Sequence, residues 1–232
     1  QALIYDFVFL KGSSSEMISD QDIPTTFPIF PLSGAVLFPQ TRLPLNIFEP
    51  RYLSMIDAAL AGARYVGMVQ PRQSTQETVI DGSEIYEVGC LGRLTAFAET
   101  DDGRYMVTLM GITRFRIVSE FELKEGYRSV QANFKEFQPE ISPADTEFDR
   151  LGFMKTLKTY LLTLGSEENQ ETFEHADDQA LVSTIALAAP FTPEEKQAIL
   201  ECPKLGNQAR LMRSIMEMAA YSGDPENPRL KH

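Results

Sequence analysis

The chain has 232 residues, of which 43% are hydrophobic and 23% are charged, so it can bury a proper core in one large domain or two small ones. No uninterrupted apolar run approaches the roughly 20 residues that a membrane helix needs, which argues against a membrane protein and makes the cytoplasm the expected compartment. The net charge of −12 is concentrated in residues 136–232, where 9 Lys and Arg stand against 17 Asp and Glu. Because a nucleic-acid binder needs clustered basic residues to displace counterions, this distribution argues against a nucleic-acid partner.

The first 26 residues do not read as part of a fold. The polar stretch KGSSSE at 11–16 is typical of a flexible segment, and Met17-Ile18-Ser19-Asp20 resembles a translation start. We therefore expect residues 1–26 to be a disordered extension, in which residues 1–16 are either a non-native remnant or a native tail.

From Phe27 to Tyr52 the sequence FPIFPLSGAVLFPQTRLPLNIFEPRY alternates short apolar runs with prolines. A proline lacks the N–H that a sheet ladder uses, so these runs are expected to be edge strands or strand ends. The prolines concerned are Pro28, Pro31, Pro39 and Pro44. Pro50 has a φ that suits the first position of a helix, and Glu49 places negative charge at that helix N-terminus. The pattern predicts strand, loop, strand and then a helix over Pro50–Ala61.

The stretch after this helix is mainly β in character. Alternating residues separated by turn signals, such as Asp102-Gly103, indicate further short strands. These strands are expected at Arg64–Gln70, Tyr86–Glu99, Arg104–Met110, Thr113–Leu123 and Tyr127–Phe137. At least six short strands with one helix among them favour a closed or nearly closed barrel, because closure removes exposed sheet edges.

Beyond Pro139 the apolar period changes from 2 to about 3.6, which predicts helices. They are expected at 148–164, 178–189, 192–201 and 207–221. Thr192, Pro193 and Glu195 have the spacing of an N-cap, a proline at the first helical position and a capping-box glutamate.

These elements predict an α+β fold class. We expect a β-barrel with one inserted helix over residues 27–138 and a C-terminal helical bundle over 139–222. Residues 223–232 contain Gly and two prolines that cannot continue a helix, so they are expected to be a flexible tail.

Four motifs, in the same order, resemble the substrate-binding domain found at the N-terminus of Lon proteases. They are IFEPRY at Ile47–Tyr52, YVGMV at Tyr65–Val69, VGCLG at Val88–Gly92 and the G-x-x-R-x-R-I run at Gly111–Ile117. The IFEPRY variant is most similar to small stand-alone proteins built around that domain. The resemblance covers Phe27–Tyr221, nearly all of the chain.

The resemblance implies a PUA-like barrel and a non-enzymatic, ATP-independent module that binds polypeptides. Its partners would be unfolded segments or a protein such as a protease or chaperone. Some PUA-like proteins bind RNA, but the charge distribution argues against that here, and fold alone does not decide function. The alternatives are a small-molecule- or RNA-sensing barrel and an unrecognised hydrolase.

No catalytic or cofactor motif is visible in the sequence. There is no Gly-Lys pair, which excludes a P-loop of the G-x-x-x-x-G-K-[ST] type. Cys90 and Cys202 lie far apart, and His175 and His232 are too few to complete a structural zinc site. Paired carboxylates such as Asp101-Asp102 stand at expected turns or helix starts, where solvated charge is favoured over a metal site. We therefore expect no catalytic residue, no cofactor and no metal.

Glu49, Arg51, Arg114 and Arg116 are charged residues within the predicted barrel. We expect Glu49 to pair with Arg114 or Arg116 and to tie the helix at Pro50 to a strand. Glu49, Pro50, Arg51 and Tyr52 would then form a structural motif with the two strand arginines. The alternative is an anionic ligand held by the arginines, because arginine forks bind carboxylates of either origin.

The apolar loop Val36, Leu37, Phe38 and Pro39 is the candidate polypeptide-binding site. An exposed apolar patch of more than a few hundred Å² marks a binding site, but the same residues suit a core, and for Phe38 the core is favoured. Four methionines pose the same choice between an adaptable peptide-binding face and packing between helices. They are Met154, Met212, Met216 and Met218.

Overall fold

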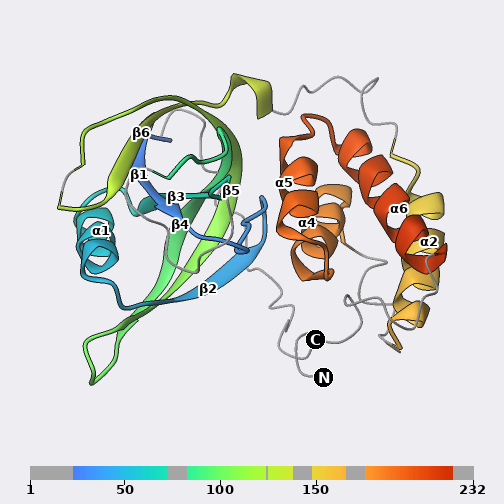
Figure 1. Ribbon diagram of the computed structural model, residues 1–232, viewed down its shortest axis with the longest axis horizontal. Helices are drawn as coiled ribbons and strands as arrows, with labels where there is room; N and C mark the ends of the chain where they lie inside the picture. The colour runs from blue at the N-terminus through green and yellow to red at the C-terminus, as the bar shows by residue number, and fades with distance from the viewer. Residues whose placement is uncertain (1–22, 73–82, 124, 138–147, 166–175, 222–232) are drawn as a thin grey trace.

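The computed structural model describes residues 23–72, 83–123, 125–137, 148–165 and 176–221, and it shows an α+β protein (Figure 1). The strands are β1 (Thr26–Pro31), β2 (Arg42–Ile47), β3 (Tyr65–Val69), β4 (Val88–Glu99), β5 (Tyr105–Glu120) and β6 (Arg128–Asn133). The helices are α1 (Pro50–Ala61), the short 3-10 helix η2 (Lys135–Phe137), α2 (Arg150–Thr163), α4 (Asp178–Ala188), α5 (Pro193–Glu201) and α6 (Leu205–Tyr221). Residues 1–22 of the expected extension, the expected boundary at Pro139 and the tail 223–232 lie outside the described residues.

The six strands form one mixed sheet in the order β2-β5-β4-β3-β1-β6, and β6 also pairs with β5. The pairings of β5, β4, β3, β1 and β6 therefore return on themselves, and among the described strands β2 is attached to this ring only through β5. β1 runs parallel to β3, with Ile29 opposite Gly67, whereas the other strand pairs are antiparallel.

The strands expected at 104–110 and 113–123 are one continuous strand, β5, so the expected break between them is wrong. Gly111 stays in the ladder because its N–H donates to the carbonyl oxygen of Thr41 at 2.8 Å. The register against β4 shifts beside Gly111, so the chain bends there instead of ending the strand. The bend lets the first half of β5 pair with β2 and the second half with β6.

Two apolar clusters hold this arrangement together. The smaller cluster draws on all five strands of the ring and includes Ile29, Leu91 and Phe115. A Cβ at Gly67 would lie 2.8 Å from the rings of both Phe27 and Phe115, so glycine is needed where the two aromatic side chains meet. The larger cluster joins α1 and the loop before β2 to the C-terminal helices.

The helices follow their local sequence signals. α1 runs over Pro50–Ala61, as expected from Pro50. α5 begins at Pro193, and the expected capping box is present: the Thr192 hydroxyl accepts from the N–H of Glu195, whose carboxylate accepts from the N–H of Thr192. α4 and α5 stand between the sheet and the α2–α6 pair (Figure 1).

Candidate functional site

The loop proposed from the sequence as a binding surface is part of the core. Val36, Leu37 and Phe38 each expose 3% or less of their surface, and Pro39 is half-buried. The Thr41 hydroxyl holds the loop by donating to the carbonyl oxygen of Phe38 at 2.8 Å. The core position favoured for Phe38 is therefore confirmed, and the alternative of an exposed polypeptide-binding surface is wrong for Val36 and Leu37 as well, because core packing takes up their apolar area.

The expected pairing of Glu49 with a strand arginine is also wrong. Glu49 pairs instead with Arg51, two residues along the chain, at 2.9 Å. Arg51 in turn lies over the ring of Tyr52, 4.6 Å from its centroid. The IFEPRY charges thus form a local contact at the start of α1, because the helix start turns the Arg51 side chain back toward Glu49 and not across to β5.

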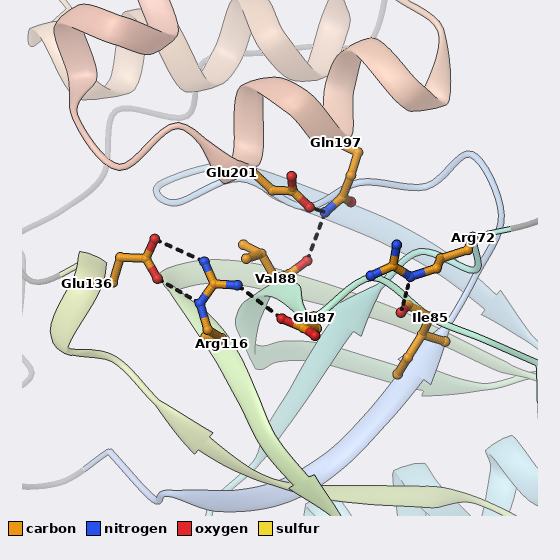
Figure 2. Close-up of polar contacts among 8 residues, drawn as sticks. All are labelled: Arg72, Ile85, Glu87, Val88, Arg116, Glu136, Gln197 and Glu201. Atoms are coloured by element: carbon orange, nitrogen blue, oxygen red, sulfur yellow. Dashed lines mark hydrogen bonds and ion pairs between the residues drawn. The ribbon is translucent and has the colours of Figure 1, made fainter.

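Arg116 makes an ion pair with Glu136, which lies in the 3-10 helix after β6 (Figure 2). Its Nε and Nη2 atoms donate to the two carboxylate oxygens at 2.8 and 3.0 Å, and its Nη1 reaches Glu87 at 3.3 Å. The hydrogen bonds from Arg116 hold the pKa of Glu136 below its ordinary value. Both partners are substantially exposed, so this contact ties β5 to the segment after β6 at the surface.

Arg114, which was one of the two arginines expected to pair with Glu49, instead donates hydrogen bonds to the backbone at the end of α5. Its Nη1 donates to the carbonyl oxygens of Leu200, at 2.9 Å, and Cys202, and its Nη2 donates to that of Pro203 at 2.8 Å. These oxygens lie at the C-terminal end of α5, where helix carbonyls lack partners within the helix. Burial lowers the pKa of Arg114 to about 10, so the side chain remains charged at neutral pH. Because both terminal nitrogens donate to carbonyl oxygens of the protein, the alternative of an anionic ligand finds no support at this residue.

Further polar contacts join α5 to the sheet beside Arg114. The Gln197 amide donates to the carbonyl oxygen of Val88 at 3.1 Å and to Glu201 at 2.9 Å (Figure 2). The buried Gln70 amide donates to the carbonyl oxygen of Pro193 at 3.0 Å and to Gln197 at 3.2 Å. The described junction between sheet and helices is thus held by hydrogen bonds as well as by the larger apolar cluster.

The four methionines are divided between core and surface. Met212 and Met216 are fully buried and Met154 is half-buried, so these three pack between helices. Met218 differs from these three because its side chain lies at the surface and is 60% exposed. Packing is therefore the main role of this set.

An apolar surface that the sequence reasoning missed lies at the end of the β4–β5 hairpin. We define the hairpin end as residues 95–106; in Figure 1 it projects beyond the rest of the sheet. Every residue of Thr95–Glu99 is exposed, although the sequence there is TAFAE. Phe97 is 43% and Met106 45% exposed, and the rings of Phe97 and Tyr105 meet edge to face with centroids 5.0 Å apart. The signal available in the sequence was strand length, since the expected strand at Tyr86–Glu99 is twice as long as its neighbour at Arg64–Gln70.

Acidic groups surround this apolar end. A hydrogen bond to the Asp57 carboxylate of α1 raises the pKa of Tyr105, and the charges of Asp57 and Glu99 add to the effect. The turn adds two further acidic residues, Asp101 and Asp102. The basic residue of the hairpin end is Arg104, which forms an ion pair with Asp102 at 2.9 Å. The face that carries Phe97 and Tyr105 is therefore apolar and bordered by acidic groups, and Met106 lies on the opposite face.

In the described part of the chain, no three His, Cys, Asp or Glu side chains gather in a metal-binding arrangement. Cys90 and Cys202 are free, and burial raises the pKa of both thiols. His175 lies outside the described residues. Among the described helices, none has the length and apolarity to cross a membrane.

Comparison with known sequences places the chain among Lon-type proteins. Residues 26–218 match the model of the ATP-dependent protease La (LON) substrate-binding domain. Lon protease 2 of Myxococcus xanthus is 27% identical over 207 residues, which are 86% of this chain and 24% of that protease. The Lon protease of Desulfosudis oleivorans is 32% identical over 94 residues, 40% of this chain and 12% of that protein. The chain thus spans about a quarter or less of the length of these relatives.

Solved structures share the fold. The Lon N-terminal domain protein from Xanthomonas campestris aligns with a TM-score of 0.60 at 20% identity, covering 82% of this chain and 98% of that one. The N-terminal domain of the Mycobacterium avium complex Lon protease aligns with a TM-score of 0.59 at 16% identity, covering 83% and 98%. Because the matched model spans most of the chain and both structures reproduce its fold, the protein belongs to the Lon substrate-binding domain family.

Proposed function

We propose that this chain is a non-enzymatic polypeptide-binding module that contacts unfolded segments through the apolar end of its β4–β5 hairpin. The observation that carries the proposal is the match to a substrate-binding domain over residues 26–218, combined with exposed Phe97 and Met106 at a projecting part of the sheet. Phe97 lies with Tyr105 on one face of the hairpin and Met106 lies on the other, so both faces expose an apolar side chain. Exposed apolar area that is rimmed by charge is typical of protein-binding surfaces.

We also propose how the chain is divided into two parts and where it acts. Residues 27–138 would form a PUA-like barrel and residues 139–222 a helical bundle, with α5 fixed to the barrel by Arg114 and Gln197. The module would act in the cytoplasm without ATP, and its partner would be an unfolded segment or a protease or chaperone that handles one. RNA is disfavoured as a ligand because the net charge is −12 and the hairpin end is acidic.

The test compares one probe in two states. Fluorescently labelled lysozyme would be used either native or reduced and carboxamidomethylated, so that sequence and net charge stay constant while apolar segments become accessible. We expect the unfolded form to bind at least about tenfold more tightly than the native form, a difference of about 1.4 kcal/mol. Electrophoresis of the mixtures, without ATP or any added protease, should show no fragments.

A matched pair of variants locates the surface. Phe97→Thr should weaken binding of unfolded lysozyme, whereas Phe121→Thr removes a phenylalanine of similar exposure, 47%, at the other end of β5 and should leave it unchanged. Equal binding of native and unfolded lysozyme by the wild-type chain would refute the polypeptide-binding function. Fragments of the probe would instead favour a hydrolase.

A further inference from the structure

β4 is longer than the strand on one of its sides, and this leaves part of its backbone without a strand neighbour. Its pairing with β3 ends at Tyr65 opposite Arg93, followed by one more hydrogen bond from the N–H of Leu94 to the carbonyl oxygen of Arg64 at 2.8 Å. From Thr95 to Glu99, β4 pairs with β5 alone within the described residues. The hairpin end therefore has an open edge on the side that β3 does not reach (Figure 1).

The turn geometry tells which backbone groups point toward this open edge. The N–H of Gly103 donates to the carbonyl oxygen of Thr100, and the N–H of Thr100 to that of Arg104, both at 2.9 Å. Gly103 has φ +77, as expected for a three-residue hairpin loop closed by Thr100 and Arg104. Since hydrogen-bonded and non-hydrogen-bonded pairs alternate along an antiparallel ladder, the N–H and C=O groups of Phe97 and Glu99 face away from β5.

The other open edge of the sheet is protected. β2 pairs with β5 alone, and the same alternation turns the backbone of Arg42, Pro44 and Asn46 away from β5. Pro44 has no N–H to offer, and prolines on edges are a common protection against strand addition. Pro44 therefore interrupts the row of N–H donors on the β2 edge, whereas Thr95–Glu99 has no proline, so both Phe97 and Glu99 can donate to and accept from an incoming strand.

A second group of exposed apolar residues lies at the other end of β5, where the unpaired edge is shorter. Val118, Phe121 and Leu123 lie near the β5–β6 hairpin, where β6 pairs on one side with β5 and on the other with β1. The N–H of Phe121 donates to the carbonyl oxygen of Ser129 at 2.9 Å. On its other side β5 pairs with β4 up to Arg116, so within the described residues Val118–Glu120 is without a second strand, a shorter stretch than Thr95–Glu99.

We propose that an extended polypeptide segment binds as an added strand on the edge of β4, paired to the backbone of Phe97 and Glu99. This inference rests on the proposed polypeptide-binding function and specifies its mode. Strand addition takes affinity from the main chain and specificity from alternate side chains. Phe97 supplies the apolar contact for one set of alternate residues, and Glu99, Asp57 and Asp101 favour lysine or arginine beside them. The substrate class is therefore an extended, proline-free segment with alternate apolar residues and a basic flank.

The test uses the full chain and a labelled peptide, Lys-Lys-Val-Thr-Val-Thr-Val-Thr, in two backbone N-methylated forms. In one form the valine nitrogens are methylated, and in the other the threonine nitrogens. In a strand, alternate N–H groups point to opposite sides, so methylation of one set should reduce affinity at least about tenfold while methylation of the other changes it less than about twofold. Replacing the two lysines by glutamates should weaken binding, and the difference should shrink as salt is raised because exposed charges are screened.

Variants link the effect to the edge. Phe97→Thr should weaken binding of the unmethylated peptide, whereas Phe121→Thr should not. The peptide series itself needs no variant, so a folding defect in Phe97→Thr leaves the proposal testable.

Equal affinity of the two methylated forms, or loss of binding in Phe121→Thr alone, would overturn strand addition at β4. If the peptide does not bind while unfolded lysozyme does, this inference fails and the proposed function stands. Failure of both ligands would refute the function itself. A wild-type dimer in sedimentation that Phe97→Thr dissociates would show that a second copy takes the edge, which also overturns the proposal.

Discussion

The Nη1 atom of Arg114 in β5 lies 2.9 Å from the carbonyl oxygen of Leu200 in α5. The same side chain reaches the carbonyl oxygens of Cys202 and Pro203, and it stacks over Phe137 with 4.6 Å between the guanidinium carbon and the ring centroid. One strand arginine thus satisfies the end of a helix that is 86 residues further along the chain. This contact is one of several that hold α5 against the sheet, together with the hydrogen bonds of Gln197 and Gln70.

Arg114→Ala should therefore lower the free energy of unfolding by about 2–4 kcal/mol, because hydrogen bonds from a charged donor are strong and buried carbonyl oxygens would lose their partners. Denaturant unfolding of this variant and of Arg210→Ala, which removes an exposed arginine from α6, measures the difference. Equal midpoints for the two variants would show that the carbonyl contacts contribute nothing to stability.

Gly111→Ala should destabilise the sheet by about 3 kcal/mol, as expected for overpacking where backbone blocks relaxation. A Cβ at this position would overlap the carbonyl oxygen of Phe38, so strand and loop would have to separate. Gly62→Ala is the matched control, because its Cβ would lie 3.4 Å from its nearest neighbour and the change should stay within about 0.5 kcal/mol. A melting temperature of Gly111→Ala equal to that of the control would contradict the close approach.

Phe38→Ala should cost about 3–5 kcal/mol, the range for removing a buried phenylalanine. Phe48→Ala removes the same side chain where it is 63% exposed and should change stability by less than about 0.5 kcal/mol. Thermal unfolding followed by circular dichroism distinguishes the two. A stable Phe38→Ala protein would mean that the loop before β2 is not part of the core.

Glu136 should titrate below its ordinary pKa of 4.5, because Arg116 donates two hydrogen bonds to its carboxylate. A carboxylate with a lowered folded-state pKa contributes stability above its unfolded-state pKa and loses it as the pH falls through the folded-state value. The contribution is therefore complete at neutral pH and is lost below about pH 4.5; since the pair is exposed, it should stay within about 1 kcal/mol. Carbon-13 NMR titration of the Glu136 carboxyl in the wild type and in Arg116→Gln checks this. An unchanged titration in the variant would rule out the pairing.

Local signals in the sequence were enough to place most elements. Pro50 set the start of α1, and Thr192 and Glu195 set the start of α5, because a cap depends on residues within one helical turn. The same reasoning divided β5 in two at Gly111, because a glycine that ends a strand and one that admits a close neighbour look alike in a sequence. The neighbour, Phe38, is distant along the chain.

The candidate site was harder to predict. Val36, Leu37 and Phe38 are apolar enough to form an exposed binding loop. They are buried because the surrounding elements cover them in the tertiary structure. Phe97 is of a residue type that is usually buried, and it is exposed because β3 ends before reaching it. The length of one strand relative to its neighbour decides which apolar residues meet solvent.

Sequence by itself determined the class of fold, the family motifs and the helix starts, because each depends on residue type and short-range spacing. Tertiary structure alone decided the partners of Glu49 and Arg114 and the exposure of the hairpin end. Charged side chains pair with whichever group the fold brings within reach, and burial is a property of packed neighbours. Ion pairing and burial both depend on contacts between residues that are far apart in the chain. Periodicity and local propensity carry no information about such contacts.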